Sequence, residues 1–374
     1  MTTTTVAPKK TRIIDFGRGR LFPGSPSPGR NSGLIALGTT TLDTRRPIHV
    51  AISGAAGRVA YALLFRIANG GLFGKEQPIA LSLLDLPERL NLLEAHAMEL
   101  RECAFPLLHG LRFGSDQVQM FREADWVILL GGKRFGSSSQ SRVDLLHQNA
   151  PIMIAHARAI NRASPKARVL VVASPCNTNC LVAMSHAQDV PREHWFALNQ
   201  VIRSRAIAMV AEKARVPVTQ VTRLTVWGNN SENAYVDLQN ARIGELPAVQ
   251  VIGDPKWSHE VFDRALADQF REIVRRTGET PAGSTAHAIL ATIRAITTPT
   301  PFEHWFGAGV ASDGTYYEVP RGLVFGFPLI TADGKTWTIP RDHYLDAQAR
   351  ERIARNVAEL ELEALAVSHL LGKA

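Results

Sequence analysis

Hydrophobic residues along the chain fall into short unbroken runs that are separated by longer amphipathic stretches. The first of these runs, Ile48–Ser53, leads directly into a glycine-rich turn at 54–57, and the residues after the turn have helical spacing. Further runs at 79–84, 126–130 and 169–173 are apolar nearly throughout, which is typical of strands that are buried on both faces. Because strands alternate with helical stretches, we expect an α/β fold, a doubly wound and mainly parallel sheet.

Residues 1–46 lack this pattern. They open with four threonines and contain a segment rich in Pro, Gly and Ser at 23–29, a composition typical of flexible chain. They hold eight cations and two anions, so 34 of the 42 cations and 32 of the 34 anions lie in residues 47–374. A nucleic-acid-binding protein would gather its cations on a folded face. The sequence therefore predicts a flexible basic extension at 1–46 and argues against nucleic acid as a partner.

The composition excludes several classes of protein. The chain has 374 residues, of which 45% are hydrophobic and 20% charged, so it is neither fibrous nor disordered nor a small disulfide scaffold. No apolar run approaches the roughly 20 residues that span a bilayer, and no signal-peptide core precedes the fold. Cys103, Cys176 and Cys180 lack the spacing of a zinc site or a disulfide framework. We expect a cytoplasmic protein without a membrane segment or a metal site.

The start of the folded region predicts a dinucleotide site. Gly54 and Gly57 separate a strand from a helix, an arrangement that presents helix N-terminal amides to a pyrophosphate. The next apolar run ends on Asp85, where an acid accepts hydrogen bonds from a ribose and favours NAD over NADP. A tight turn without a ligand is the alternative, but strand, glycines, helix, second strand and acid occur in the order that the site requires.

Seven segments stand in the order found in a known family. They are SGAAGRVAY (53–61), NGGLFGK (69–75), LLDL (83–86), MELRECAFPLL (98–108), PCNTNCL (175–181), VWGNNS (226–231) and GVASDG (309–314). On these segments the chain resembles the malate dehydrogenases, in particular the cytosolic-type branch that includes the chloroplast enzymes. The resemblance implies a Rossmann-type NAD-binding domain at 47–197 and an α+β substrate domain at 198–374.

The resemblance also implies the chemistry. In that family a hydride passes between the nicotinamide and the C2 carbon of malate, a histidine exchanges a proton, and an aspartate orients the histidine. Contacts to NAD, through side chains or backbone, are implied for Gly54, Gly57, Arg58, Val59, Asp85, Gly131, Asn149 and Ser174.

Both members of the proton relay depart from the family pattern. The family histidine follows Trp-Gly-Asn, and here Trp227–Asn229 is followed by Asn230. The family aspartate lies three residues before an arginine, and here Ile202 precedes Arg205 at that spacing. An amide has no proton to transfer near neutral pH, and an isoleucine cannot orient one. The residues that bind the cofactor in the family are therefore kept, whereas the residues that react with malate are altered.

The residues that hold substrate are kept in part. Arg205 and Arg142 match two family arginines, whose planar forks bind carboxylates bidentately. The loop before Arg142 is about one residue longer than usual, and its first family arginine has no clean counterpart unless Arg134 serves by a shift. Ser174 stands where the family has an asparagine before Pro175.

Other side chains are candidates for a replacement proton-transfer role. Lys133 ends a predicted strand where nicotinamide and loop meet, and His287 lies one turn after Ser284, which matches a pocket-lining serine. The ordinary interpretations are a solvated lysine and a structural or exposed histidine. Asn230 can still hydrogen-bond a carbonyl or hydroxyl without transferring a proton. The remaining candidates are Cys176 and Arg203.

Three functions fit these features. The first is an NAD-dependent oxidoreductase that acts on a small anionic substrate other than malate. The second is a non-redox enzyme that uses the old pocket for a cyclisation or elimination, and the third is a catalytically silent NAD-binding homologue. The resemblance implies a homodimer, and helical spacing from Asp346 to Leu371 predicts a long closing helix.

Overall fold

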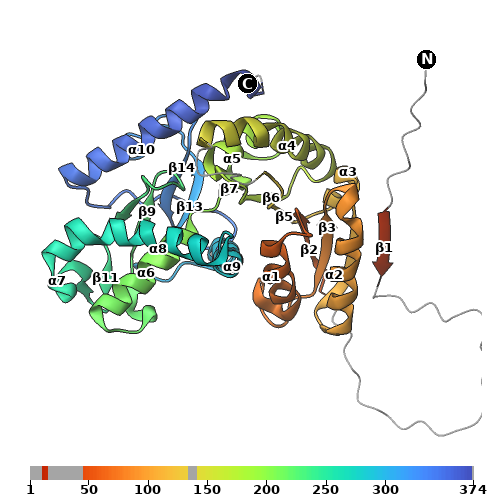
Figure 1. Cartoon of the computed structure of the whole chain (residues 1–374), viewed down its shortest axis with the longest axis horizontal. Coiled ribbons are helices and arrows are strands. Elements are labelled where there is room, and N and C mark those ends of the chain that lie inside the picture. Colours follow the sequence, from red (N-terminus) through yellow and green to blue (C-terminus); the bar gives the residue numbers. More distant parts are fainter. Residues whose placement is uncertain (1–10, 16–44, 134–140, 373–374) are drawn as a thin grey trace, which may run out of the picture.

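The computed structural model describes residues 11–15, 45–133 and 141–372. Among these residues, nine strands form one sheet that runs through the molecule (Figure 1). In spatial order they are β1 (Thr11–Asp15), β4 (Leu108–Gly114), β3 (Ile79–Leu84), β2 (Ile48–Ser53), β5 (Trp126–Leu129), β6 (Arg168–Val171), β7 (Trp195–Ala197), β13 (Phe306–Ala311) and β14 (Val324–Leu329).

The central strands, from β4 to β7, pair in parallel, which confirms the predicted doubly wound sheet. Alternate side chains of β2 enter different cores, as the pleat of a strand requires. Val50 and Ile52 belong to the core that also contains side chains of α1 (Arg58–Arg66) and α2 (Leu90–Glu102). Ala51 belongs to the core on the other face, below α4 (Arg142–Ala163) and α5 (Cys176–Ser185). Both faces of the sheet are therefore covered.

The remaining helices and strands lie mainly in the C-terminal half. The helices are α3 (Gln117–Phe121), α6 (Gln200–Ala214), α7 (Ala248–Ile252), α8 (Phe262–Thr277), α9 (Ala282–Thr297) and α10 (Ala347–Ala366). The short strands are β8 (Val221–Thr222), β9 (Thr225–Trp227), β10 (Tyr235–Asp237), β11 (Arg242–Ile243) and β12 (Leu246–Pro247). Single helical turns are η1 (Ile67–Gly71), η2 (Pro87–Arg89), η3 (Arg192–His194), η4 (Val218–Gln220), η5 (Trp257–Val261) and η6 (Ser368–Leu370).

The N-terminal strand departs from the expectation of a purely flexible extension. β1 pairs antiparallel with β4, with Thr11 opposite Gly114 and Asp15 opposite Gly110. This pairing occupies the edge of β4, whose backbone groups would otherwise be open to another chain. The sequence does not predict this strand, because five residues inside a Pro-, Gly- and Thr-rich segment are too few to show an alternation of hydrophobic and polar positions.

The sheet continues from the first predicted domain into the second. β13 pairs antiparallel with β7 through Gly309 and Ala197, and a Cβ on Gly309 would lie 2.8 Å from that of Ala197. β14 then pairs with β13 along its whole length. The two halves are therefore joined by backbone hydrogen bonds as well as by packing.

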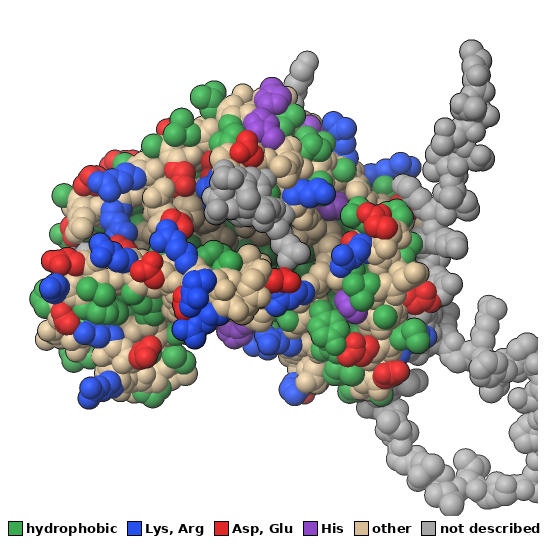
Figure 2. Space-filling model, in the orientation of Figure 1, with side chains coloured by type: hydrophobic (Ala, Val, Ile, Leu, Met, Phe, Trp, Pro, Cys, Tyr) green, Lys and Arg blue, Asp and Glu red, His purple; other side chains and the backbone are tan. Residues whose placement is uncertain are grey.

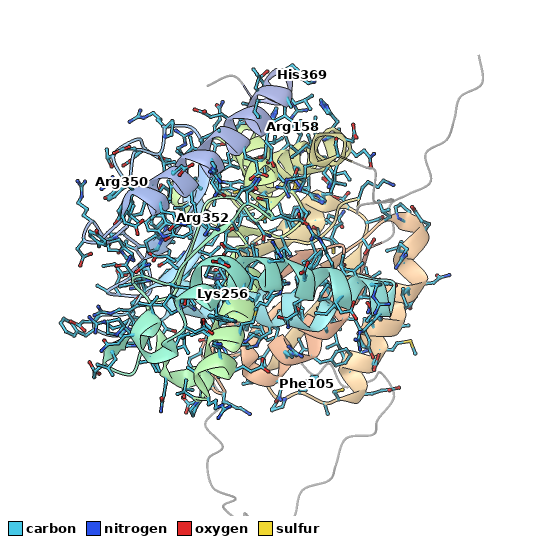
Figure 3. The ribbon with its side chains drawn as sticks, turned by 60° about the vertical axis from the view of Figure 1, so that its left-hand side comes forward. Phe105, Arg158, Lys256, Arg350, Arg352 and His369 are labelled. Atoms are coloured by element: carbon cyan, nitrogen blue, oxygen red, sulfur yellow. The ribbon has the colours of Figure 1, made fainter. Side chains whose placement is uncertain are left out.

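The predicted closing helix is present as α10. Its N-cap, Asp346, accepts a hydrogen bond from the amide of Ala349 at 2.7 Å. Arg352 lies on this helix (Figure 3). It ties the helix to the C-terminal half, because its guanidinium stacks on Tyr235 at 4.8 Å and pairs with Asp263 at 2.6 Å. The helix leads back to α5, which it contacts (Figure 1).

Cations and anions are interspersed on the face shown in Figure 2, without a broad area of one sign. None of the helices in the described ranges is long and apolar enough to cross a bilayer.

Candidate functional site

The turn after β2 requires glycine at position 54. Gly54 has φ +67°, and a Cβ there would lie 2.7 Å from the backbone of Gly131 at the end of β5. The amide of Gly131 donates to the Ser53 hydroxyl at 3.1 Å. The ends of β2 and β5 are therefore held in direct contact, with backbone and no side chain at the surface of the turn.

The N-terminus of α1 has the features of an anion-binding site. Its N-cap is Gly57, which supplies no side-chain cap, and no acidic residue lies in its first turn. The first amides of a helix have no partner within the helix and attract phosphate. The Arg58 side chain is engaged in an ion pair with Glu279, and the Val59 side chain packs on the core. The predicted contacts of Arg58 and Val59 with a pyrophosphate would thus be made by their backbone amides.

Asp85 ends β3 beside this turn. One carboxylate oxygen accepts the amide of Ala56 at 2.7 Å and the other accepts the amide of Leu86 at 2.8 Å. Each oxygen keeps a second lone pair, and the residue is only half-buried. The turn, the helix end and the carboxylate together fit the diphosphate and ribose of NAD.

Asn149 is buried and joins, by hydrogen bonds, the segments that follow β5 and β6. Its amide accepts from the Lys133 amide at 2.6 Å and donates to the carbonyls of Lys133 and Ser174 at 3.1 and 2.8 Å. It is fully buried, whereas Lys133 and Ser174 are exposed. Asn149 therefore positions the segments around Lys133 and Ser174, and its part in binding NAD stays a prediction.

Asn230 follows β9 and faces α5. Its side-chain amide lies 3.4 Å from the Cys176 sulfur, and its backbone amide donates to Asn177 Oδ1 at 3.3 Å. Burial raises the pKa of the Cys176 thiol to about 11, so the thiol is neutral at physiological pH. Among the described residues, the hydrogen bonds of Asn230 thus involve no group that titrates near neutral pH.

Arg142, the first residue of α4, is paired with the C-terminal helix. Its Nε donates to Glu363 Oε1 at 2.8 Å and lies 3.9 Å from Glu359. The same Glu363 oxygen accepts from Asn229 at 2.9 Å, and the other accepts from the Thr178 hydroxyl. Glu363 is only 3% exposed, and Arg142 Nη2 is buried without a hydrogen-bond partner among the described residues. Arg142 is thus paired with a protein carboxylate, and the substrate contact that the sequence implies for it stays a prediction.

Arg205 lies on α6 and contacts α8. Its Nη1 donates to the Leu266 carbonyl at 3.2 Å, and its guanidinium stacks on Phe270 at 5.5 Å. Burial lowers its pKa, but no carboxylate of the described residues lies within ion-pair distance of it. Arg205 is therefore a half-buried cation without a counter-ion in this part of the chain.

The other candidates on α6 have structural surroundings. Arg203 is directed to the backbone, with its Nε 2.8 Å from the Leu224 carbonyl, and burial lowers its pKa to about 10. Ile202 packs at the edge of the apolar core around α6.

Lys133 and His287 are both exposed. Within 45–133 and 141–372, neither side chain has a hydrogen-bond or ion-pair partner, and Arg134 lies outside the described residues. The structure thus brings together Asn230, Arg142 and Cys176, and it leaves Lys133 and His287 outside this group. Sequence reasoning missed Glu363, Asn229 and Thr178, which complete the group.

Comparison with known proteins decides the family. The NAD-binding domain of lactate/malate dehydrogenase matches residues 48–196, and the alpha/beta C-terminal domain of the same family matches residues 202–369. The chain belongs to the lactate/malate dehydrogenase family. Its cofactor is accordingly NAD, and the resemblance seen in the sequence is confirmed at the level of the family.

Individual relatives cover nearly the whole folded region. The malate dehydrogenase of Protochlamydia amoebophila is 37% identical over 327 residues, which are 87% of this chain and 99% of that protein. The crystal structure of the malate dehydrogenase from Naegleria fowleri has a TM-score of 0.83 at 33% identity, covering 87% of this chain and 99% of that one. Trichomonas vaginalis lactate dehydrogenase in complex with NADH and oxamate has a TM-score of 0.81 at 30% identity, covering 86% and 98%.

The burial of Cys176, which lies beside Asn230, predicts how the thiols of this chain react. Cys103 is exposed, whereas Cys176 and Cys180 are buried and have raised thiol pKa values. Because the thiolate is the reactive form, we expect a thiol reagent at pH 8 to modify one of the three cysteines in the native protein and all three in denaturant. In the Cys103→Ser variant the native reaction should disappear. Rapid native modification of a second thiol would contradict the burial of Cys176.

Proposed function

We propose that this chain is an NAD-dependent oxidoreductase that acts on a small anionic substrate other than malate. The observation that carries the proposal is Asn230, whose hydrogen bonds with the described residues involve a neutral thiol, an amide and an arginine, and no histidine or carboxylate. The family position of the relay aspartate is Ile202, so we take the proton relay to be absent. Losing general acid–base catalysis lowers rates by about 10²- to 10⁴-fold.

The remaining groups suit binding and orientation. When bound, the cofactor would supply a hydride in its reduced form, NADH, or accept one in its oxidised form, NAD. One proton of the Asn230 amide lies toward the Cys176 sulfur, which leaves the other free to hydrogen-bond a substrate oxygen. Arg205, which has no carboxylate partner among the described residues, is the group that we assign to the substrate anion. In this scheme the substrate oxygen exchanges its proton with water.

The same observation supports a second candidate, an NAD-binding family member without turnover. Asn230 and Ile202 are what a silent site would carry, because a buried aspartate without its histidine would be an unpaired charge. Turnover on some anionic substrate separates the two candidates. A homodimer stays a prediction from the resemblance, and a cytoplasmic location stays a prediction from the sequence.

Arg205→Ala tests the proposed anion site. In the complex with NADH, we expect this variant to bind oxamate at least about tenfold more weakly than the unaltered protein, because a charge-assisted hydrogen bond is lost. Binding is measured by titration of NADH fluorescence. Arg275→Ala, an exposed change on α8, is the control and should leave oxamate affinity unchanged. An unaltered affinity in Arg205→Ala would show that the anion site has been placed wrongly.

A further inference from the structure

An ion pair joins the first residue of α1 to the segment between α8 and α9. Arg58 begins α1, and its Nη1 contacts the carboxylate of Glu279. The two residues are 221 positions apart in the sequence, so the pair links the NAD-binding domain to the C-terminal half of the chain. Helix α9 packs against α1 and keeps the two segments adjacent (Figure 1). The pair therefore lies at the helix N-terminus where we expect the diphosphate of NAD.

The start of a helix is an unfavourable place for a cation. The N-terminus carries a partial positive charge, so an arginine in the first turn is destabilising unless an anion lies nearby. Arg58 is the first residue of α1, and the first turn of this helix has no acidic residue. Within the described part of the chain, the anion that contacts Arg58 is Glu279. An arginine at this position thus suits a further anion, such as the diphosphate of the cofactor.

The guanidinium of Arg58 has donors for a second partner. Its contact with Glu279 uses Nη1, and no hydrogen bond of its Nε or Nη2 is found among the described residues. A guanidinium has five N–H donors in a planar fork, and the fork binds phosphate oxygens as well as carboxylate oxygens. The side chain is 53% exposed, so it can turn toward a ligand without breaking buried contacts.

Glu279 is held by a tight turn. Gly278 ends α8 with φ +70°, and the amide of Glu279 donates to the Thr277 hydroxyl at 3.2 Å. Helix α9 begins at Ala282, so only a short connection carries Glu279. The backbone of Glu279 is therefore fixed beside α1, and Arg58 is the partner that can move.

We propose that the guanidinium of Arg58 binds the diphosphate of NAD and exchanges Glu279 for the cofactor. Glu279 then competes with the diphosphate for the same cation and lowers the affinity for the cofactor. Arg58 raises that affinity, in addition to the contribution of its backbone amide. The proposal concerns the cofactor alone, so it depends neither on the identity of the substrate nor on turnover.

Arg58→Gln and Glu279→Gln test the exchange by NADH binding alone. Each change removes one charge and keeps a side chain that forms hydrogen bonds. In calorimetry at physiological salt, we expect Arg58→Gln to bind NADH about tenfold more weakly and Glu279→Gln to bind it about threefold more tightly. The matched controls are Arg275→Gln and Glu272→Gln, the same charge changes in an exposed ion pair of α8. Both controls should leave the affinity for NADH unchanged, because salt screens charges that are distant from the ligand.

The double variant Arg58→Gln/Glu279→Gln separates exchange from direct repulsion. In the exchange, Glu279 acts through Arg58, so Glu279→Gln should gain little affinity once Arg58 is replaced. An equal gain with and without Arg58 would overturn the exchange and would mean that Glu279 repels the diphosphate directly.

The single variants can also contradict the proposal. An unchanged affinity in Arg58→Gln would leave the diphosphate to the backbone amides alone. Weaker binding in Glu279→Gln would mean that the ion pair helps to hold the cofactor in place and does not compete with it. Denaturant unfolding without NADH should give all these variants nearly the same stability, because exposed ion pairs contribute little. A change in affinity can then be assigned to the cofactor site and not to misfolding.

Discussion

Gly54→Ala is expected to lower the free energy of unfolding by about 3 kcal/mol and to weaken NADH binding at least about tenfold. The residue has φ +67°, and the new Cβ would lie 2.7 Å from Cα and N of Gly131. These are backbone atoms of a neighbouring strand end, so relief of the clash must separate β2 from β5. That separation distorts the turn from which the amides of α1 meet the pyrophosphate. Denaturant unfolding and NADH calorimetry measure the two effects.

Gly244→Ala separates the clash from the backbone strain. Gly244 has a similar φ of +57°, but no atom lies within 4 Å of the position that a Cβ would occupy. This control should be destabilised by only about 1 kcal/mol, with normal NADH affinity. Equal losses in the two variants would mean that strain alone explains Gly54 and that its contact with Gly131 is unimportant.

Glu363→Ala is expected to lower the free energy of unfolding by about 3–5 kcal/mol. The change removes the only strong partner of the Arg142 guanidinium in the described chain and both acceptors used by Asn229 and Thr178. A partly buried guanidinium then has only the more distant Glu359, at 3.9 Å, and two polar groups are left unpaired. Urea or guanidinium unfolding provides the measurement, with the slope checked for two-state behaviour.

Two further variants serve as controls for Glu363→Ala. Glu363→Gln keeps the hydrogen bonds in part and should be destabilised by much less than Glu363→Ala. Glu361→Ala, exposed on the same helix, should change stability by no more than about 0.5 kcal/mol. A loss below about 1 kcal/mol in Glu363→Ala would indicate that the network is dispensable and that Arg142 finds another partner.

The cofactor half could be predicted from the sequence because its signals are local. β2 and β3 begin and end at the residues where the apolar runs do, and the glycine turn and Asp85 adjoin them in the chain. A strand buried on both faces must be apolar throughout, and only glycine fits the turn at position 54. The fold class follows from the alternation of such strands with helices.

The substrate half could be predicted only in part because its contacts are tertiary. Sequence spacing brings Asn230 and Arg142 to the site by resemblance, but the partner of Arg142 comes from α10, 221 residues further along the chain. A weak signal was available: Asn356 and Glu363 share the buried face of α10 with Ile353 and Leu360. A polar residue on an apolar helix face predicts a buried partner, but it does not say which one.

The central claim is that the NAD site is kept while the family's proton relay is absent. One titration of the purified protein with NADH, followed by addition of oxaloacetate to the same sample, tests it most directly. We predict NADH binding in the micromolar range, and oxaloacetate reduction at least about 10²-fold slower than that of the Protochlamydia amoebophila malate dehydrogenase under the same conditions. Turnover of oxaloacetate at a rate comparable to that of the relative would contradict the claim and would mean that another group replaces the missing histidine.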